Sequence, residues 1–247
     1  MLNFGTLQKK YEIYLEMSCD ITPPSSEVDV FLENRLKDAD VDKIAIVLVG
    51  GPGSGKSGAK IKTVQLLGKK LSNFVNIDPD EILTTLFDNN TNCYDKVSVI
   101  NNKSYEMAIE QNKNIIFDGT GRNFEWYSTN VIKRLKDLDY VVNLVIVMNE
   151  ADIVLNRIAE RARQTGRHVN TTYMKSVYKA LNEAIPQYLS LDCLYSNNIF
   201  LYDNTDNLHL VYSSSCNNTG RKFLQHIKGG KTKKSRKYKR SRRTCRN

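Results

Sequence analysis

Residues 43–58, KIAIVLVGGPGSGKSG, constrain the fold of this chain more than any other segment. An apolar run typical of a buried strand leads into the pattern G-x-x-x-x-G-K-[ST], whose fixed positions are Gly50, Gly55, Lys56 and Ser57. Glycines let the backbone curl so that successive N–H groups point at phosphate oxygens, and the helix start that follows adds its positive dipole end. The pattern predicts a strand, loop and helix that bind a nucleotide phosphate.

The same pattern predicts the cofactors. A lysine at this position reaches the β- and γ-phosphates, and the hydroxyl after it ligates Mg²⁺, so we expect ATP and Mg²⁺. A Gly-rich turn without a ligand is the alternative, but the full pattern arises by chance in only about 1% of chains this long. The residues expected to contact the nucleotide are Gly51, Gly53, Ser54, Gly55, Lys56 and Ser57.

Composition bounds the class of protein. The chain has 247 residues, of which 40% are hydrophobic, enough for one large core. No apolar run approaches the roughly 20 residues needed to cross a bilayer, and the N-terminus carries charges where a signal peptide is apolar. We expect an intracellular protein, cytoplasmic or nuclear, that is neither secreted nor in a membrane. The five cysteines, without a C-x-x-C pair, predict reduced thiols rather than zinc ligands or disulfides: Cys19, Cys93, Cys193, Cys216 and Cys245.

The positive charge is confined to the C-terminus. Residues 228–247 hold eleven Lys or Arg and no acid, which leaves 25 basic and 27 acidic residues, a net charge of about −2, in the rest. Such a block repels itself and buries little, so the pattern predicts a disordered tail. It suits non-specific contact with nucleic acid, nuclear localisation or solubilisation, and these remain alternatives.

Apolar runs alternate with helical patterns along the rest of the chain. This alternation predicts an α/β fold, a P-loop NTPase with a five-stranded parallel sheet flanked by helices. The expected strands are Ile44–Val49, Asn73–Ile77, Asn114–Phe117, Val141–Val147 and Ile199–Tyr202. The expected helices run from the phosphate loop to about Leu71, over Tyr105–Gln111, from Val131, and over Thr172–Leu189 with a kink or restart at Pro186.

Three parts are expected. Residues 1–42 form an N-terminal helical extension of two amphipathic stretches on the outside of the sheet, without chemistry of their own. Residues 43–227 form the P-loop domain, and residues 228–247 form the basic tail.

Two carboxylates follow the second strand, where ligands bind in open α/β sheets. Asp78 and Asp80 suit a general base for a substrate hydroxyl and a partner that holds Mg²⁺ or its waters. For Asp78 there is a competing interpretation, because an Asp followed by Pro79 is a good helix start by itself.

The third strand ends in an acid and a Gly-punctuated loop, FDGTGR. Asp118 has the form of the strand-end carboxylate that holds Mg²⁺ in nucleotide sites. Thr120 and Arg122 follow on a loop expected to face the substrate, although a plain surface loop also accounts for Arg122.

A helix rich in arginine follows the fourth strand. Its arginines are Arg157, Arg161, Arg163 and Arg167. Arginines on a closing lid stabilise the negative charge that phosphoryl transfer spreads over the γ-oxygens. The alternative is a solvated basic face.

Residues 43 to about 203 resemble the zeta-toxin kinases, P-loop enzymes that phosphorylate a sugar hydroxyl of UDP-N-acetylglucosamine. The resemblance rests on the order GGPGSGKS, I-D-x-D, an acid on a helix, DGTGR and an Arg-rich segment that ends in GR-x-V. Toxins of this family are held inactive by a small antitoxin, but the resemblance does not identify such a partner for this chain. The resemblance implies that Lys56 and Ser57 bind ATP and Mg²⁺ and that Asp80 is the general base. It also implies that Glu106 binds the substrate, that Thr120 and Arg122 lie near the transferred phosphate group, and that Arg161 and Arg167 contact the phosphates.

The sequence therefore predicts an ATP- and Mg²⁺-dependent kinase that acts on a hydroxyl of a small molecule. A polynucleotide or nucleotide kinase on the same scaffold is the first alternative, which the basic tail would suit. The second is a non-catalytic nucleotide-binding module tethered to nucleic acid. The identity of the phosphate acceptor depends on loops whose sequence does not predict which molecule they bind.

Overall fold

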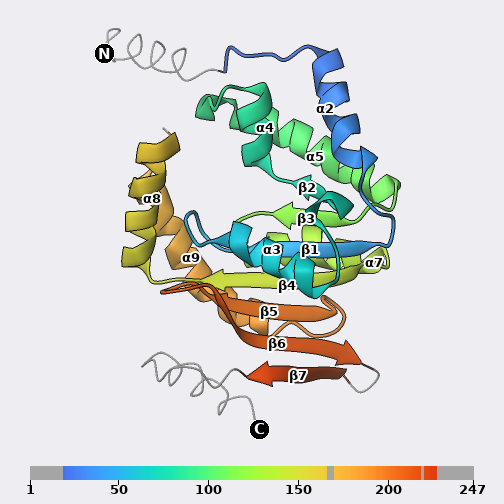
Figure 1. The fold of residues 1–247 in the computed structure, drawn as a ribbon, viewed down its shortest axis with the longest axis vertical. Coiled ribbons are helices and arrows are strands. Elements are labelled where there is room, and N and C mark those ends of the chain that lie inside the picture. The colour runs from blue at the N-terminus through green and yellow to red at the C-terminus, as the bar shows by residue number, and fades with distance from the viewer. Residues whose placement is uncertain (1–18, 166–169, 218–219, 227–247) are drawn as a thin grey trace, which may run out of the picture.

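The computed structural model describes residues 19–165, 170–217 and 220–226 (Figure 1). One seven-stranded sheet runs through it, with the strand order β2-β3-β1-β4-β5-β6-β7. The strands are β1 (Ile44–Val49), β2 (Val75–Ile77), β3 (Ile115–Asp118), β4 (Val141–Met148), β5 (Asn198–Asp203), β6 (His209–Asn217) and β7 (Gly220–His226).

Helices connect the strands and cover both faces of the sheet. They are α2 (Ser25–Lys37), α3 (Lys56–Leu66), α4 (Pro79–Leu86), α5 (Tyr94–Glu110), α6 (Phe124–Tyr127), α7 (Arg134–Asp137), α8 (Ala151–Thr165) and α9 (Thr171–Leu189). Single turns of 3₁₀-helix lie at Leu71–Asn73 (η1) and Thr91–Cys93 (η2), and a π-helical segment at Ser128–Lys133 (η3) joins α6 to α7.

Five neighbouring strands, from β2 to β5, are parallel, as the alternation predicts. The sheet continues with β6 and β7, which are antiparallel and were not expected as a hairpin. The sequence of β6, HLVYSSSCN, ends in serines and asparagine, which are typical of loops. Pairing with β6 provides hydrogen-bond partners for the backbone N–H and C=O groups along the edge of β5. This gain outweighs the low strand propensity of the β6 sequence.

The core lies on both faces of the sheet because side chains alternate along each strand. Ala45, Val47 and Val49 of β1 face the larger core, which includes residues of α2, α5, α7 and α9. Ile46 and Leu48 face the opposite side, where α3 packs. A third cluster joins α4, η2 and α5 with the segment before α2.

Helices α5 and α9 differ from the sequence-based expectation. Helix α5 begins at Tyr94, about eleven residues before the expected start, because Val97, Asn101 and Ser104 are buried at helical spacing although Asn and Ser favour helices weakly. Helix α9 does not restart at Pro186 but runs on to Leu189. The buried residues on either side of the proline, Ile185 and Tyr188, hold this last turn on the core.

The N-terminal extension packs on the domain through α2. Leu32 and Leu36 of this helix are buried, and its contacts are with α5 and β2. The first amphipathic stretch of residues 1–42 falls in residues 1–18, which lie outside the described residues, and so does the basic tail 228–247.

The cysteines correct an expectation. Four of the five form disulfides, Cys19–Cys93 and Cys193–Cys216, so they are not reduced thiols in this structure. The partners are 74 and 23 residues apart in sequence, and only the fold brings them together. Across the described residues, none of the helices has the length and apolar character needed to span a membrane.

Candidate active site

The phosphate loop lies between β1 and α3, as the pattern predicts. Gly53 and Gly55 adopt positive φ angles of 73° and 92°, which glycine reaches without steric cost, and Gly55 is the N-cap of α3. Lys56 opens the helix and Ser57 is its second residue. The loop therefore has the strand, turn and helix arrangement that presents backbone N–H groups to an anion.

Three other elements hold the loop. The carbonyl of Ser54 accepts hydrogen bonds from the side-chain amides of Asn149, at 3.0 Å, and Asn204, at 2.9 Å. The hydroxyl of Tyr178 on α9 donates to the carbonyl of Pro52 at 2.9 Å. These residues follow β4, follow β5 and lie on α9, and sequence reasoning missed them because no motif contains them.

Lysines from α3 flank the acid at the end of β3. The ammonium groups of Lys56 and Lys60 lie 3.8 and 3.7 Å from different oxygens of Asp118, and all three side chains are mostly buried. Lys56 also donates to the carbonyl of Gly50 at 3.0 Å. Lys56 and Asp118, both predicted for the nucleotide site, thus lie close together, and Lys60 is a further cation that sequence reasoning missed.

Asp78 and Asp80 lie where β2 gives way to α4. The carboxylate of Asp78 caps the helix by accepting from the Asp80 N–H at 2.9 Å. Burial, and then the charges of Asp118 and Asp80, raise the pKa of Asp78 to about 6. Asp80 accepts a hydrogen bond from the Tyr94 hydroxyl at 3.0 Å. The capping role of Asp78 is therefore present, and its charge is coupled to the other two acids.

These residues fit a magnesium site of the kind found with nucleotides. Within the described ranges, no group of three or more His, Cys, Asp or Glu could hold a metal by itself. Mg²⁺ bound with phosphates needs only one or two protein ligands, because waters and phosphate oxygens supply the rest. Burial first, and then repulsion from Asp118 and Asp80, raise the pKa of Asp78, and a divalent cation near Asp118 would offset part of that repulsion. Ser57 and Asp118 are the residues that would hold it.

The DGTGR loop contacts the phosphate loop and borders a cavity. The Thr120 carbonyl accepts from the Gly50 N–H at 3.1 Å, and Arg122 stacks over the ring of Tyr173 at 5.1 Å. A cavity of about 460 Å³ lies between this loop and α9, lined by Arg122, Asn123, Phe124, Glu125, Ser176, Ala180, Glu183, Ala184 and Gln187. Arg122 is exposed, so its guanidinium is accessible from this cavity.

Glu106 is not brought to this site. Both of its carboxylate oxygens accept from the guanidinium of Arg134 at 2.6 Å. It lies twelve residues, about 18 Å along α5, from Tyr94, which contacts Asp80. Arg134 begins α7, the last helix before β4, so the pair sits toward the amino ends of the strands. Ligands of open α/β sheets bind at the opposite edge.

The arginines of α8 separate into different environments. Arg163 forms an exposed pair with Glu160 at 2.9 Å. A guanidinium nitrogen of Arg157 is buried without a hydrogen-bond partner among the described residues, and its charge acts on Tyr178, whose pKa burial raises. The side chain of Arg161 and all of Arg167 lie outside the described residues. Among the described arginine side chains of α8, Arg157 is the one whose charge acts on Tyr178, which contacts the phosphate loop at Pro52.

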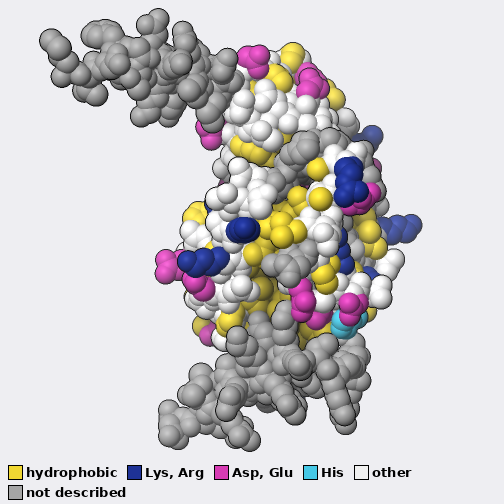
Figure 2. Space-filling model, turned by 90° about the vertical axis from the view of Figure 1, so that its left-hand side faces the viewer, with side chains coloured by type: hydrophobic (Ala, Val, Ile, Leu, Met, Phe, Trp, Pro, Cys, Tyr) yellow, Lys and Arg dark blue, Asp and Glu magenta, His cyan; other side chains and the backbone are white. Residues whose placement is uncertain are grey.

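Figure 2 shows the side of the molecule to which β3 and β4 point in Figure 1. Hydrophobic side chains gather near the middle of this face, and Lys and Arg side chains are spread around them. This edge of the sheet carries the phosphate loop, the strand-end acids and α8, so the candidate site is assembled from segments far apart in sequence.

Fold and site together define a P-loop kinase. The chain belongs to the zeta toxin family, because the family model described as Zeta toxin matches residues 31–215. This confirms the resemblance noted from the sequence and supports a nucleotide-dependent, kinase-like function. A comparison with curated proteins gave no match.

Solved structures share the fold at low sequence identity. The AvrRxo1-ORF1:AvrRxo1-ORF2 complex matches with a TM-score of 0.64 and 14% identity over 76% of this chain and 66% of that chain. The same complex with ATP matches with a TM-score of 0.59 and 14% identity, over 83% and 66%. The PezAT chromosomal toxin–antitoxin system of Streptococcus pneumoniae matches with a TM-score of 0.55 and 18% identity, over 78% and 81%. This chain thus spans about two thirds of the AvrRxo1 chain that it matches.

Proposed function

We propose that this protein is an ATP- and Mg²⁺-dependent phosphotransferase that moves the γ-phosphate of ATP to a hydroxyl of a small molecule. One observation carries the proposal. The carboxylate of Asp118 lies between Lys56 and Lys60 beside the phosphate loop, and its charge acts on Asp78, which caps the helix that carries Asp80. This arrangement supports the proposal, because it would bring anion-binding groups, metal-binding groups and a base to one sheet edge.

Each residue has a role in this reaction. Lys56 neutralises charge that grows on the transferred phosphate. Ser57 and Asp118 would hold Mg²⁺, which would supply positive charge to the phosphates. Asp80 accepts the proton of the attacking hydroxyl. Arginines of the α8 segment stabilise the equatorial oxygens, and we propose Arg157 for this role beside Arg161 and Arg167.

The acceptor binds next to the DGTGR loop in this proposal. Arg122 and Thr120 belong to that loop, and the cavity beside it is lined by polar and apolar side chains, of which the polar ones suit hydroxyl groups. A UDP-sugar is the first acceptor to test, because the zeta-toxin resemblance implies one. Because Glu106 is engaged by Arg134, we no longer assign Glu106 to the acceptor.

A nucleotide or polynucleotide kinase is the second candidate. The eleven basic residues of the tail favour it, since such a segment attracts nucleic acid. We also propose a small inhibitory protein as partner, because the matched relatives are a toxin–antitoxin system and a two-protein complex.

Transfer from radiolabelled ATP to defined pools tests the proposal. The pools are UDP-sugars, nucleosides and oligonucleotides with a 5′-hydroxyl. We expect Mg²⁺-dependent label in the UDP-sugar pool, and label in either of the other pools supports the second candidate. Absence of label in every pool, together with absence of ATP binding, overturns both.

A further inference from the structure

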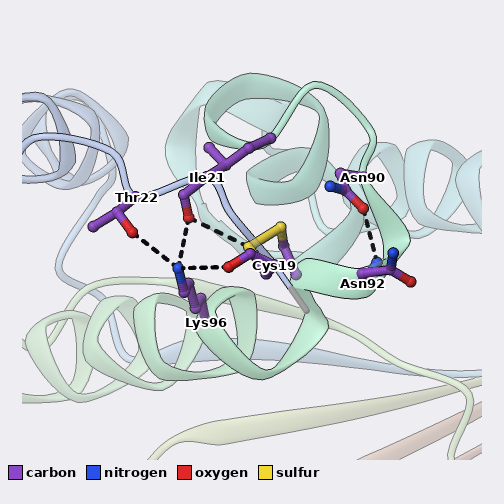
Figure 3. The surroundings of a disulfide bond; sticks show 7 residues. Cys19, Ile21, Thr22, Asn90, Asn92 and Lys96 are labelled. Atoms are coloured by element: carbon purple, nitrogen blue, oxygen red, sulfur yellow. Dashed lines mark hydrogen bonds between the residues drawn. A yellow bond between two sulfur atoms is a disulfide. The ribbon is translucent and has the colours of Figure 1, made fainter. Parts of the chain in front are cut away.

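The start of the described chain is fastened to the first turn of α5. Cys19 is bonded to Cys93, the residue just before α5. The ammonium group of Lys96, within the first turn of this helix, donates to the carbonyls of Cys19 and Ile21, at 3.2 and 2.7 Å, and to the hydroxyl of Thr22 at 2.9 Å (Figure 3). A covalent bond and three hydrogen bonds thus hold residues 19–22 at this point.

The residue between these two attachment points contacts the proposed base. Tyr94 follows Cys93 directly, and its hydroxyl donates to the carboxylate of Asp80 at 3.0 Å. Cys93 is fully buried, whereas the Tyr94 side chain is 37% exposed. The backbone that carries Tyr94 is therefore fixed by the disulfide on one side and by the contacts of Lys96 on the other.

The same N-terminal segment also holds the other side of Asp80. The guanidinium of Arg35 on α2 donates to the carbonyl of Asp78 at 3.2 Å and to the carboxylate of Glu81 at 2.9 Å. Only 6% of the Arg35 side chain is exposed. Asp78 caps α4 and Glu81 lies in its first turn, so Arg35 fixes the turn on which Asp80 stands.

We propose that residues 19–37 are a strap that positions Asp80, and that Tyr94 is its positioning residue. This inference rests on the proposed function, because it assigns a task to groups around the proposed base. The Tyr94 hydroxyl bond restrains the orientation of the Asp80 carboxylate, and a displacement of about 1 Å in a catalytic group costs on the order of a hundredfold in rate. Phosphate transfer by this protein would then depend on residues 19–37, which precede the strand and loop that bind the nucleotide.

The strap also makes the reaction sensitive to dithiols. Thiol–disulfide exchange with a dithiol reductant breaks the Cys19–Cys93 bond, gives each sulfur a hydrogen, and leaves the reductant as a disulfide. Cys19 then loses its covalent attachment, and only the contacts of Lys96 hold residues 19–22.

Tyr94→Phe in the full-length oxidised protein tests the positioning role. The readout is transfer from labelled ATP to the UDP-sugar pool. We expect kcat to fall about tenfold or more while KM for ATP stays within about twofold, since one charge-assisted hydrogen bond is lost away from the nucleotide. In an Asp80→Asn background the same change should have no further effect, because the two residues act as one unit. An unchanged kcat in Tyr94→Phe, or equal effects in both backgrounds, overturns the proposal.

Cys19→Ser tests the disulfide, with Cys193→Ser as the matched control. Both variants remove one disulfide, but the Cys193–Cys216 bond joins the segment after α9 to β6. We expect kcat to fall at least fivefold more in Cys19→Ser than in the control, and the wild type treated with dithiothreitol to behave like Cys19→Ser. Equal effects in the two variants overturn the proposal.

Hydrogen exchange separates failure of this proposal from failure of the proposed function. Amides of α4 should exchange faster in Cys19→Ser than in the wild type, whether or not an acceptor is found. If the wild type transfers phosphate but α4 and kcat are unchanged, the strap is wrong and the kinase stands. If the amides of α4 exchange faster in Cys19→Ser but the wild type transfers phosphate to none of the pools, the proposed function is wrong. If exchange is unchanged and the wild type is also inactive, both the strap and the proposed function are wrong.

Discussion

The ring of Tyr178 lies directly against Gly51 of the phosphate loop. A Cβ atom on Gly51 would lie 2.5 Å from a ring carbon, closer than side chains in proteins approach. Since the Tyr178 hydroxyl also donates to Pro52, α9 covers this part of the loop. Helix α9 therefore sets the shape of the proposed nucleotide site from outside the motif.

Gly51→Ala should weaken ATP binding by roughly one order of magnitude, about 1.4 kcal/mol, because either the loop or the ring must move. Titration calorimetry with ATP measures the effect. Adding Tyr178→Ala should recover part of the affinity, whereas Tyr178→Phe, which keeps the ring, should recover none. Recovery with Tyr178→Phe would show that the clash is not the cause.

Asp78 gives a pH-dependent prediction for stability. Its folded-state pKa is raised to about 6, so the folded protein binds this proton more tightly than the unfolded chain, and stability falls as pH rises through about 4 to 6. Asp78→Asn keeps a capping side chain and removes the charge. Above pH 6 it should raise stability by at most about 3 kcal/mol, and below about pH 4 it should have little effect.

Thermal unfolding at pH 4 and pH 7.5, in EDTA and without nucleotide, measures this difference. Magnesium is left out because a cation near Asp118 would stabilise the ionised form. The same change in Tm at both pH values would contradict the assignment of the charge to Asp78.

Asp80→Asn tests the base. The amide keeps the shape of the side chain but cannot accept the proton, so we expect ATP affinity to stay within a fewfold while transfer collapses. Asp78→Asn is the matched control and should retain most of the transfer. Equal losses of ATP binding and rate in Asp80→Asn would place Asp80 among the metal ligands instead.

Sequence alone predicted the parts of this site that are local. The phosphate loop, the strand-end acids and the existence of five parallel strands follow from short patterns, and they are present as expected. Asn149, Asn204 and Tyr178 could not be found in this way, because each contacts the loop from a distant segment. For Asn149 and Asn204, the sequence offered one indication, because both residues follow predicted strands at the edge where ligands bind.

Long-range pairing explains the remaining differences. The Cys19–Cys93 and Cys193–Cys216 bonds and the ion pair of Glu106 with Arg134 join residues that lie 23 to 74 positions apart. A periodic pattern predicts which side of a helix is buried, but it does not predict which residues pack or pair with that side. Likewise, the serines of β6 gave no strand signal, because the demand for pairing comes from the edge of β5.

The basic tail yields a prediction that depends on charge alone. Deleting residues 228–247 should leave small-molecule phosphorylation unchanged and abolish binding to duplex DNA or RNA. Binding of the full-length protein should weaken steeply with salt, with a slope of about 0.9 per phosphate contacted on B-DNA. If both proteins bind nucleic acid alike at every salt concentration, the tail serves localisation or solubility, and the polynucleotide-kinase candidate loses its main support.

The most direct test of the kinase assignment is the turnover of Lys56→Ala with ATP and Mg²⁺. Lys56 lies 3.8 Å from Asp118 and donates to the loop at Gly50, so its ammonium group is held where the phosphates would bind. Because it compensates charge that grows toward the transition state, its loss should lower turnover by about two to four orders of magnitude, or roughly 3 to 5 kcal/mol. Full ATP turnover in this variant would contradict the assignment.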